Sequence, residues 1–205
     1  MRKEVLFKIA KARLVVSRIF GTLIILLLLF TSHSFQNGGV LDILLKITGL
    51  ILLSICSFGR LWSLIYINGY KSNTLITEGP YSMVRNPLYF FSSIGAIGAG
   101  VATGNILVLA LIILFFIVYY PFTILYEETN LAGKFGDAYA EYKRRVPLFI
   151  PKLSLYKEPE VYSITVNKLV RNFAESMLLL WIFILIQIIA MLQDKGILRV
   201  FLKVP

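Results

Sequence analysis

The sequence predicts an all-α, polytopic membrane protein that forms a single membrane domain over residues 1–205. Hydrophobic residues make up 58% of the chain and charged residues 16%, and the mean hydropathy is +0.78. Soluble domains contain about 45–50% apolar and about 25% charged residues. Uncharged stretches long enough to cross a bilayer, which takes about 20 apolar residues, recur along the chain and predict about five transmembrane helices.

The N-terminal part predicts an interfacial helix followed by two spans. Residues 1–18 are rich in Lys and Arg, and their apolar residues recur near helical spacing, as in an amphipathic helix lying at a membrane surface. The first two spans are expected within residues 19–72. The first lies in the uncharged stretch 19–41, with a short outer loop at Thr31–Gly39, and the second covers about 41–58.

The central part, residues 73–151, is expected to contain the core of the protein. Its longest uncharged run, Asn86 to Tyr126, is about twice one bilayer crossing and is interrupted by Thr103-Gly104-Asn105. This pattern predicts a tight helical hairpin. The first arm carries small residues at three- and four-residue spacing, which let membrane helices approach closely. These small residues are Gly95, Ala96, Gly98, Ala99 and Gly100.

The C-terminal extension, residues 152–205, contains another uncharged stretch at 176–193, which suits either a fifth span or a re-entrant helix. Lys and Arg are concentrated in residues 1–18, 60–87 and 127–171, and this bias predicts that these segments share one side, the cytosol. A fifth span fits the bias poorly, because it would leave the basic C-terminal residues on the other side.

Two turns in succession mark the candidate site, in the stretch Leu75–Phe91. Glu78-Gly79-Pro80-Tyr81 predicts a turn, since Gly frees the backbone and Pro presets a turn dihedral. Asn86-Pro87 predicts a second break, since the residue before a proline is disfavoured in a helix. Irregular polar backbone at membrane depth is tolerated only when it is buried in protein or faces water. The stretch therefore indicates a functional site.

A pair of acids, Glu127-Glu128, follows the hairpin. A purely structural explanation is that the two acids only mark where a membrane helix enters water. Acids at a helix C-terminus interact unfavourably with the helix macrodipole, so this explanation weakens if the helix ends at Glu128. It survives if the helix continues beyond that residue.

Three ordered blocks resemble the isoprenylcysteine carboxyl methyltransferase and phospholipid methyltransferase superfamily of integral-membrane enzymes. The blocks are GPYSMVRNPLY, the Glu127-Glu128 pair and FGDAYAEYKRRVPLFIP, and the resemblance covers roughly residues 41–151. Two positions depart from the usual signature: Asn86 stands where His is usual, and Phe91 stands where Gly is usual.

The resemblance implies that S-adenosyl-L-methionine is the cofactor and that its pocket lies at the cytosolic face. It implies catalytic roles for Arg85, Glu127 and Glu128, with Arg85 suited to grip a carboxylate with two hydrogen bonds. An amine acceptor needs a base, which a glutamate can supply, whereas Asn86 cannot titrate near neutrality. The implied cofactor-binding residues are Gly79, Pro80, Tyr81, Val84, Arg85, Asn86, Pro87, Tyr89, Glu128, Tyr139 and Tyr142.

The resulting hypothesis is methyl transfer to a lipophilic, membrane-embedded acceptor, either an isoprenylcysteine-type carboxylate or a lipid amine. The expected partners are membrane lipids and a lipophilic or lipid-anchored substrate, and the expected location is the bacterial inner membrane or the endoplasmic reticulum. Two alternatives stay open: a steroid-reductase-like membrane reductase using NADPH, and a non-catalytic homologue. The adjacent glutamates and the VPLFIP exit favour the methyltransferase.

Two other classes are disfavoured. One His and one Cys offer no transition-metal cluster, so no metal site is predicted. The net charge of +10 sits at the ends of apolar segments, where membrane orientation and anionic headgroups explain it better than nucleic acid does.

Overall fold

The computed structural model describes residues 3–31, 39–67, 74–161, 164 and 166–201, except for the side chains of residues 3–6, 8–10 and 14. The predicted all-α class is confirmed, since the described part contains helices and no strand. The elements are α1 (Lys3–Phe30), α2 (Val40–Ile67), α3 (Pro80–Met83), α4 (Pro87–Ala102), α5 (Ile106–Arg145), the 3-10 turn η1 (Leu153–Leu155) and α6 (Val166–Asp194).

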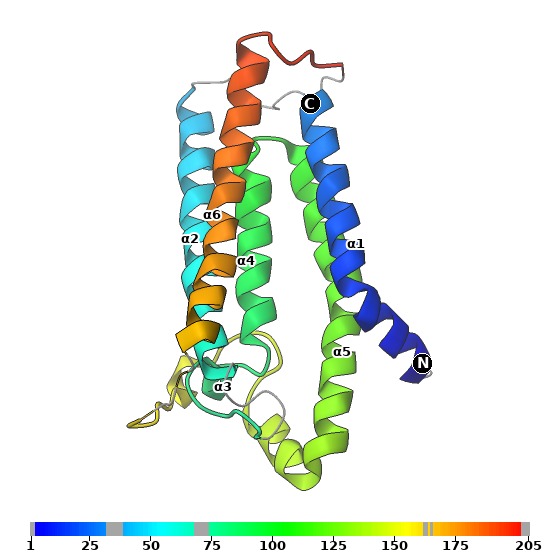
Figure 1. Ribbon diagram of the computed structural model, residues 1–205, viewed down its shortest axis with the longest axis vertical. Coiled ribbons are helices and arrows are strands. Elements are labelled where there is room, and N and C mark those ends of the chain that lie inside the picture. Colours follow the sequence, from blue (N-terminus) through cyan, green and yellow to red (C-terminus); the bar gives the residue numbers. More distant parts are fainter. Residues whose placement is uncertain (1–2, 32–38, 68–73, 162–163, 165, 202–205) are drawn as a thin grey trace.

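Within these described residues, four helices have the length and apolar composition to cross a membrane. They are Lys11–Phe30 of α1, and α2, α5 and α6 over their whole lengths, and the shorter apolar α4 joins them. The long helices run side by side (Figure 1), with α2, α4 and α6 packed together and α1 packed on α5.

The predicted hairpin is present as α4 and α5, joined by Thr103-Gly104-Asn105. Two side chains close this turn: Thr103 Oγ1 donates to the Gly100 carbonyl at 2.6 Å, and Asn105 Oδ1 accepts from the Val108 amide at 3.1 Å. Asn105 thus caps the N-terminus of α5, where helical amides lack intrahelical partners.

Small residues on α4 allow it to pack tightly against α2, as the sequence predicts. A Cβ atom added at Gly98 would come within 2.7 Å of Leu52 Cβ, and one added at Gly95 would come within 2.4 Å of Cys56 Sγ. Both distances are shorter than real carbon contacts. The close approach of α2 and α4 therefore depends on these glycines.

The structure differs from the expected N-terminal boundaries. Residues 3–30 form one continuous helix, so the residues expected at the interface and those expected in the first span share a single helix. Helix α2 likewise continues to Ile67 and includes Arg60, whose guanidinium hydrogen-bonds Ser92 on α4.

The C-terminal stretch forms an unbroken helix, α6, which packs along α2 and reaches the end of the bundle that holds the α4–α5 turn (Figure 1). This length and course favour a fifth crossing over a re-entrant helix. Near its end, Gln193 Nε2 donates to the carbonyls of Leu28 (2.7 Å) and Thr31 (3.1 Å), which satisfies acceptors at the C-terminus of α1.

The α2–α4 contact gives a prediction about stability. Gly98→Leu should lower the free energy of unfolding by about 1–3 kcal/mol, because overpacking a close contact forces the helices apart. Gly133→Leu is the matched control, since a Cβ there meets no atom within 4 Å. Thermal unfolding in detergent micelles measures both, and equal melting temperatures would contradict the packing role of Gly98.

Candidate functional site

The first turn of the site depends on the backbone of Gly79, which has φ +58°. L-residues with a side chain rarely adopt this conformation. The ring of Tyr66 also occupies the space where a Cβ would lie, with Cζ 2.4 Å from that position. Pro80 then begins α3, and the Gly79 amide donates to the Lys157 carbonyl at 2.8 Å. The predicted turn is therefore a fixed, glycine-dependent corner.

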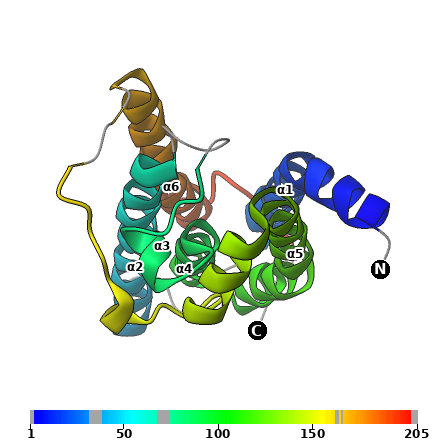
Figure 2. The same cartoon turned by 90° about the horizontal axis from the view of Figure 1, so that it is seen from below.

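The second turn, at Asn86-Pro87, starts α4 and is tied to the exit segment 146–152. Pro87 is the first residue of α4, where a missing amide hydrogen costs nothing. The Arg85 amide donates to the Pro147 carbonyl at 2.9 Å, and Asn86 Nδ2 donates to the Leu148 carbonyl at 3.2 Å. The two segments, distant in sequence, thus form one unit beneath α2 and α4 (Figure 2).

A kink in α5 brings its C-terminal part under the bundle. Gly136 has φ +50° and ψ −123°, so the helical path breaks there and resumes in a new direction. After the kink, Tyr139, Tyr142 and Val146 form a buried cluster. The Tyr142 hydroxyl donates to the Tyr81 carbonyl at 2.7 Å, which joins the end of α5 to the first turn.

At the centre of the site is a buried ion pair between Arg85 and Glu128. Arg85 Nε donates to Glu128 Oε1 at 2.7 Å, and each side chain is only 9% exposed. One terminal nitrogen of Arg85 also donates to the carbonyls of Lys143 (2.9 Å) and Val146 (3.0 Å). Lys143 Nζ lies 3.7 Å from the other Glu128 oxygen. This network joins the turn, the middle of α5 and the end of α5.

Glu127 faces a different direction, because successive residues on a helix lie about 100° apart. Its carboxylate forms an ion pair with Arg13 of α1, and the same Arg13 nitrogen donates to the Tyr89 hydroxyl at 2.8 Å. Arg13 was not among the predicted site residues. Its charge is one of several in residues 1–18, and no local signal distinguishes it from its neighbours.

An apolar cavity of about 660 Å³ lies between α4 and α5 and reaches Glu128. Aromatic rings form much of its wall, including Tyr89, Phe116, Tyr120 and Phe149. Among the described residues that line it, Glu128 is the only charged one. The cavity can therefore accommodate a hydrocarbon chain, and the Glu128 carboxylate of the protein lies at one end of it.

Two tyrosines of the cluster, Tyr139 and Tyr142, are buried at the end of α5, and Tyr139 lies beside the Glu128 carboxylate. The Tyr139 hydroxyl is fully buried against Glu128 yet makes no hydrogen bond of good geometry to any described residue. The Tyr139 hydroxyl is therefore a potential hydrogen-bond donor next to the Glu128 carboxylate.

The predicted site residues thus fall into two groups. Arg85, Asn86, Glu128, Tyr139 and Tyr142 come together around the turns, where Gly79, Pro80, Tyr81, Val84 and Pro87 are the backbone scaffold. Tyr89 and Glu127 lie on the side of α1.

The fold and the site define a polytopic, all-α membrane protein with a buried charged site at the end of an apolar cavity. The sequence profile of the phospholipid methyltransferase family matches residues 16–138. The match covers more than half of the chain, so the protein belongs to this family.

Three relatives are similar over different lengths. The cobalt-zinc-cadmium resistance protein CzcN of Cupriavidus metallidurans is 37% identical over 93% of this chain and 88% of its own length. The nickel-cobalt-cadmium resistance protein NccN of Alcaligenes xylosoxydans xylosoxydans is 34% identical over 89% and 85%. A protein-S-isoprenylcysteine O-methyltransferase of Schizosaccharomyces pombe is 36% identical over 40% of this chain and 34% of its own length. No solved structure matches the chain.

The ion pair gives a second stability prediction. Arg85→Ala should lower the free energy of unfolding by about 3–5 kcal/mol, because it leaves the Glu128 charge buried without its main partner. Arg144→Ala, which removes an exposed Arg from the same region, should change it by less than about 0.5 kcal/mol. Thermal unfolding in detergent is the measurement.

The double variant Arg85→Met, Glu128→Leu should recover part of the lost stability, since neither charge then remains buried. The loss of unfolding free energy in the double variant is compared with the summed losses in Arg85→Met and Glu128→Leu. Equal values would show that the two side chains act independently.

Proposed function

We propose that this protein transfers a methyl group from S-adenosylmethionine to a lipophilic acceptor in the membrane. The observation that carries the proposal is the apolar cavity between α4 and α5 that ends at the buried carboxylate of Glu128. Membership of the phospholipid methyltransferase family supports the reaction class, and the partial match to the isoprenylcysteine methyltransferase supports a lipid-linked acceptor.

The residues around Glu128 fit the proposed cofactor. Bound S-adenosylmethionine supplies a methyl group on a positively charged sulfur, which a carboxylate in a water-poor site attracts. Glu128 supplies a carboxylate there, and the buried Tyr139 hydroxyl beside it can donate to or accept from a polar ligand. Nε and one terminal nitrogen of Arg85 already bond within the protein, so a two-bond grip on a ligand carboxylate requires Arg85 to exchange partners. That grip stays a prediction.

The chain's own groups then have separate tasks. The cavity wall excludes water and holds the hydrocarbon part of the acceptor, which aligns the reacting atoms. A carboxylate acceptor needs no base. An amine acceptor must lose a proton, and Glu128 is the group in position to take it, because it is the titratable carboxylate that faces the cavity.

The bias of Lys and Arg along the chain supports a site that faces the cytosol, where this cofactor would be supplied. The expected membrane is the bacterial inner membrane or the endoplasmic reticulum.

The two relatives named for metal resistance raise a second candidate, direct metal binding. In the described residues no group of three or more His, Cys, Asp or Glu side chains is arranged to hold a metal ion. Because the chain belongs to the phospholipid methyltransferase family, we propose that any contribution it makes to metal resistance acts through methylation of a membrane component.

The proposed activity predicts label transfer from methyl-tritiated S-adenosylmethionine to a lipid or lipid-anchored product. Membranes containing the protein should incorporate label, and Glu128→Gln should lower the rate by about 100-fold, because it removes the charge and the base while keeping the shape. Lys195→Gln, far from the site on the exposed C-terminal segment, should leave the rate unchanged. Mass spectrometry of the extracted lipids then identifies the acceptor.

Calorimetry in detergent separates the remaining alternatives. Binding of S-adenosylmethionine without label transfer to any extract would favour a non-catalytic homologue, and binding of NADPH in its place would favour the reductase.

A further inference from the structure

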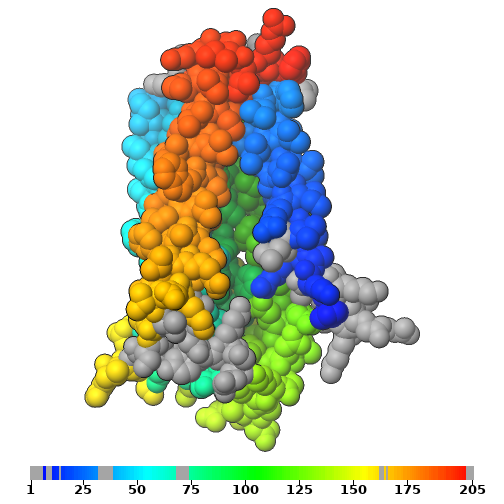
Figure 3. Space-filling view, in the orientation of Figure 1, coloured from blue at the N-terminus to red at the C-terminus, as the bar shows by residue number. Residues whose placement is uncertain are grey.

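Helix α1 packs on α5, and its C-terminal end also meets α6, where Leu28 and Ile186 belong to one buried cluster; its N-terminal half diverges from α6 (Figures 1 and 3). In its apolar half, Phe20 stacks on Phe115 of α5 with ring centroids 4.0 Å apart. Toward the charged end of the bundle its side chains are largely exposed, with Val15 and Ile19 each more than half exposed. Arg13 lies in this part of the helix and contacts both Tyr89 of α4 and Glu127 of α5.

Arg13 contacts Glu127, which does not line the cavity, and Tyr89, which does. Its ion pair with Glu127 attaches α1 to α5, and this pair is half-buried, with side chains 40% and 38% exposed. The 2.8 Å hydrogen bond to the Tyr89 hydroxyl instead reaches a residue whose ring lines the cavity. One guanidinium thus couples the docking of α1 to the position of a cavity wall.

The Tyr89 side chain has contacts at its ring and at its hydroxyl. Its ring lies nearly perpendicular to that of Tyr120, another wall residue, with ring centroids 5.6 Å apart at 76°. Its hydroxyl accepts the hydrogen bond from Arg13 and lies near the Glu127 carboxylate. The far end of the side chain is thus held at the Arg13–Glu127 pair while the ring lines the cavity.

We propose that Arg13 is a positioning residue that keeps Tyr89 in the cavity wall and thereby sets the width of the cavity between α4 and α5. Glu127 orients Arg13 for this contact, so the two adjacent glutamates have different tasks: Glu128 belongs to the charged site and Glu127 to the wall. If the proposed function holds, the width of this cavity selects the acceptor's hydrocarbon chain.

The test measures access to the cavity and requires no activity. Ser93 lines the cavity, and a thiol is introduced there by Ser93→Cys in a protein that also carries Cys56→Ala. The alkylation rate with N-ethylmaleimide in detergent is then compared between this background and added substitutions. Arg13→Gln should raise the rate by about tenfold, the factor that loss of one hydrogen bond to a charged group gives in an equilibrium.

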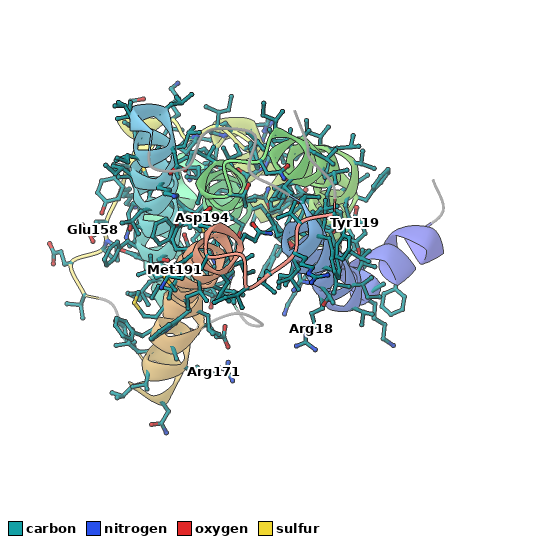
Figure 4. The ribbon with its side chains drawn as sticks, turned by 90° about the horizontal axis from the view of Figure 1, so that it is seen from above. Arg18, Tyr119, Glu158, Arg171, Met191 and Asp194 are labelled. Carbon is teal, nitrogen blue, oxygen red and sulfur yellow. The ribbon has the colours of Figure 1, made fainter. Side chains whose placement is uncertain are left out.

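Three further variants assign the effect. Tyr89→Phe removes the hydroxyl but keeps the Arg13–Glu127 ion pair. A similar increase in the alkylation rate would therefore show that movement of the Tyr89 ring, and not detachment of α1, opens the cavity. Arg13→Lys, which can still donate to Tyr89, should restore much of the slow rate. Arg18→Gln is the matched control on the same helix, since Arg18 points away from the bundle (Figure 4) and its side chain makes no hydrogen bond to a described residue.

The proposal is overturned if Arg13→Gln and Tyr89→Phe label at the background rate or more slowly, or if Arg18→Gln accelerates labelling equally. A methyl-transfer assay adds a second readout: Arg13→Gln should change KM for the lipid acceptor more than kcat, with KM for S-adenosylmethionine unchanged. Faster labelling of these variants in a protein that transfers no methyl group would support the role of Arg13 and refute the proposed function.

Discussion

The buried pair of Arg85 and Glu128 is the interaction on which the site depends. Taking two charges out of water is costly, and the cost is offset only when each charge has several well-placed partners. Here Arg85 bonds Glu128 and two carbonyls at the end of α5, and Lys143 adds a second, longer contact to Glu128. These partners come from the residue before the second turn, the middle of α5 and its end. The fold must therefore bring three distant segments to one point, and the kink at Gly136 is what lets a single helix supply two of them.

The position of this pair explains why a charged group can lie at the end of an apolar bundle. The cavity between α4 and α5 has aliphatic and aromatic walls, and Glu128 is its only charged lining residue among those the structure describes. A carboxylate next to hydrocarbon would normally be neutralised or hydrated. Arg85, Lys143 and the Tyr139 hydroxyl, none of which lines the cavity, instead give it polar neighbours. The same carboxylate thus contacts a stabilising network on one side and space for a lipid chain on the other.

Local chemistry made part of this arrangement predictable. Gly79 predicts a turn because glycine can adopt a positive φ, and Pro87 predicts another because proline lacks an amide hydrogen. The polar residues Thr103-Gly104-Asn105 predict the hairpin because they interrupt an uncharged run about two crossings long. The separate orientations of Glu127 and Glu128 and the part played by Arg13 were not predictable in this way. Both depend on how α5 is rotated and on which helix packs beside it, and Arg13 lies 114 residues from Glu127 in sequence. Such pairings are tertiary, and no periodicity in the chain encodes them.

The two departures from the usual family signature have physical explanations in this chain. Asn86 donates its amide hydrogen to the Leu148 carbonyl and so ties the start of α4 to the exit segment, a structural task that needs a donor and no titrating group. Phe91 places its ring where a side chain on Gly59 of α2 would lie, so the larger residue on α4 is matched by the absence of one on α2. Neither side chain takes part in the Arg85–Glu128 ion pair or lines the cavity at Glu128. Because Asn86 cannot exchange a proton near neutrality, its side chain serves this site as a hydrogen-bond donor and not as an acid or base.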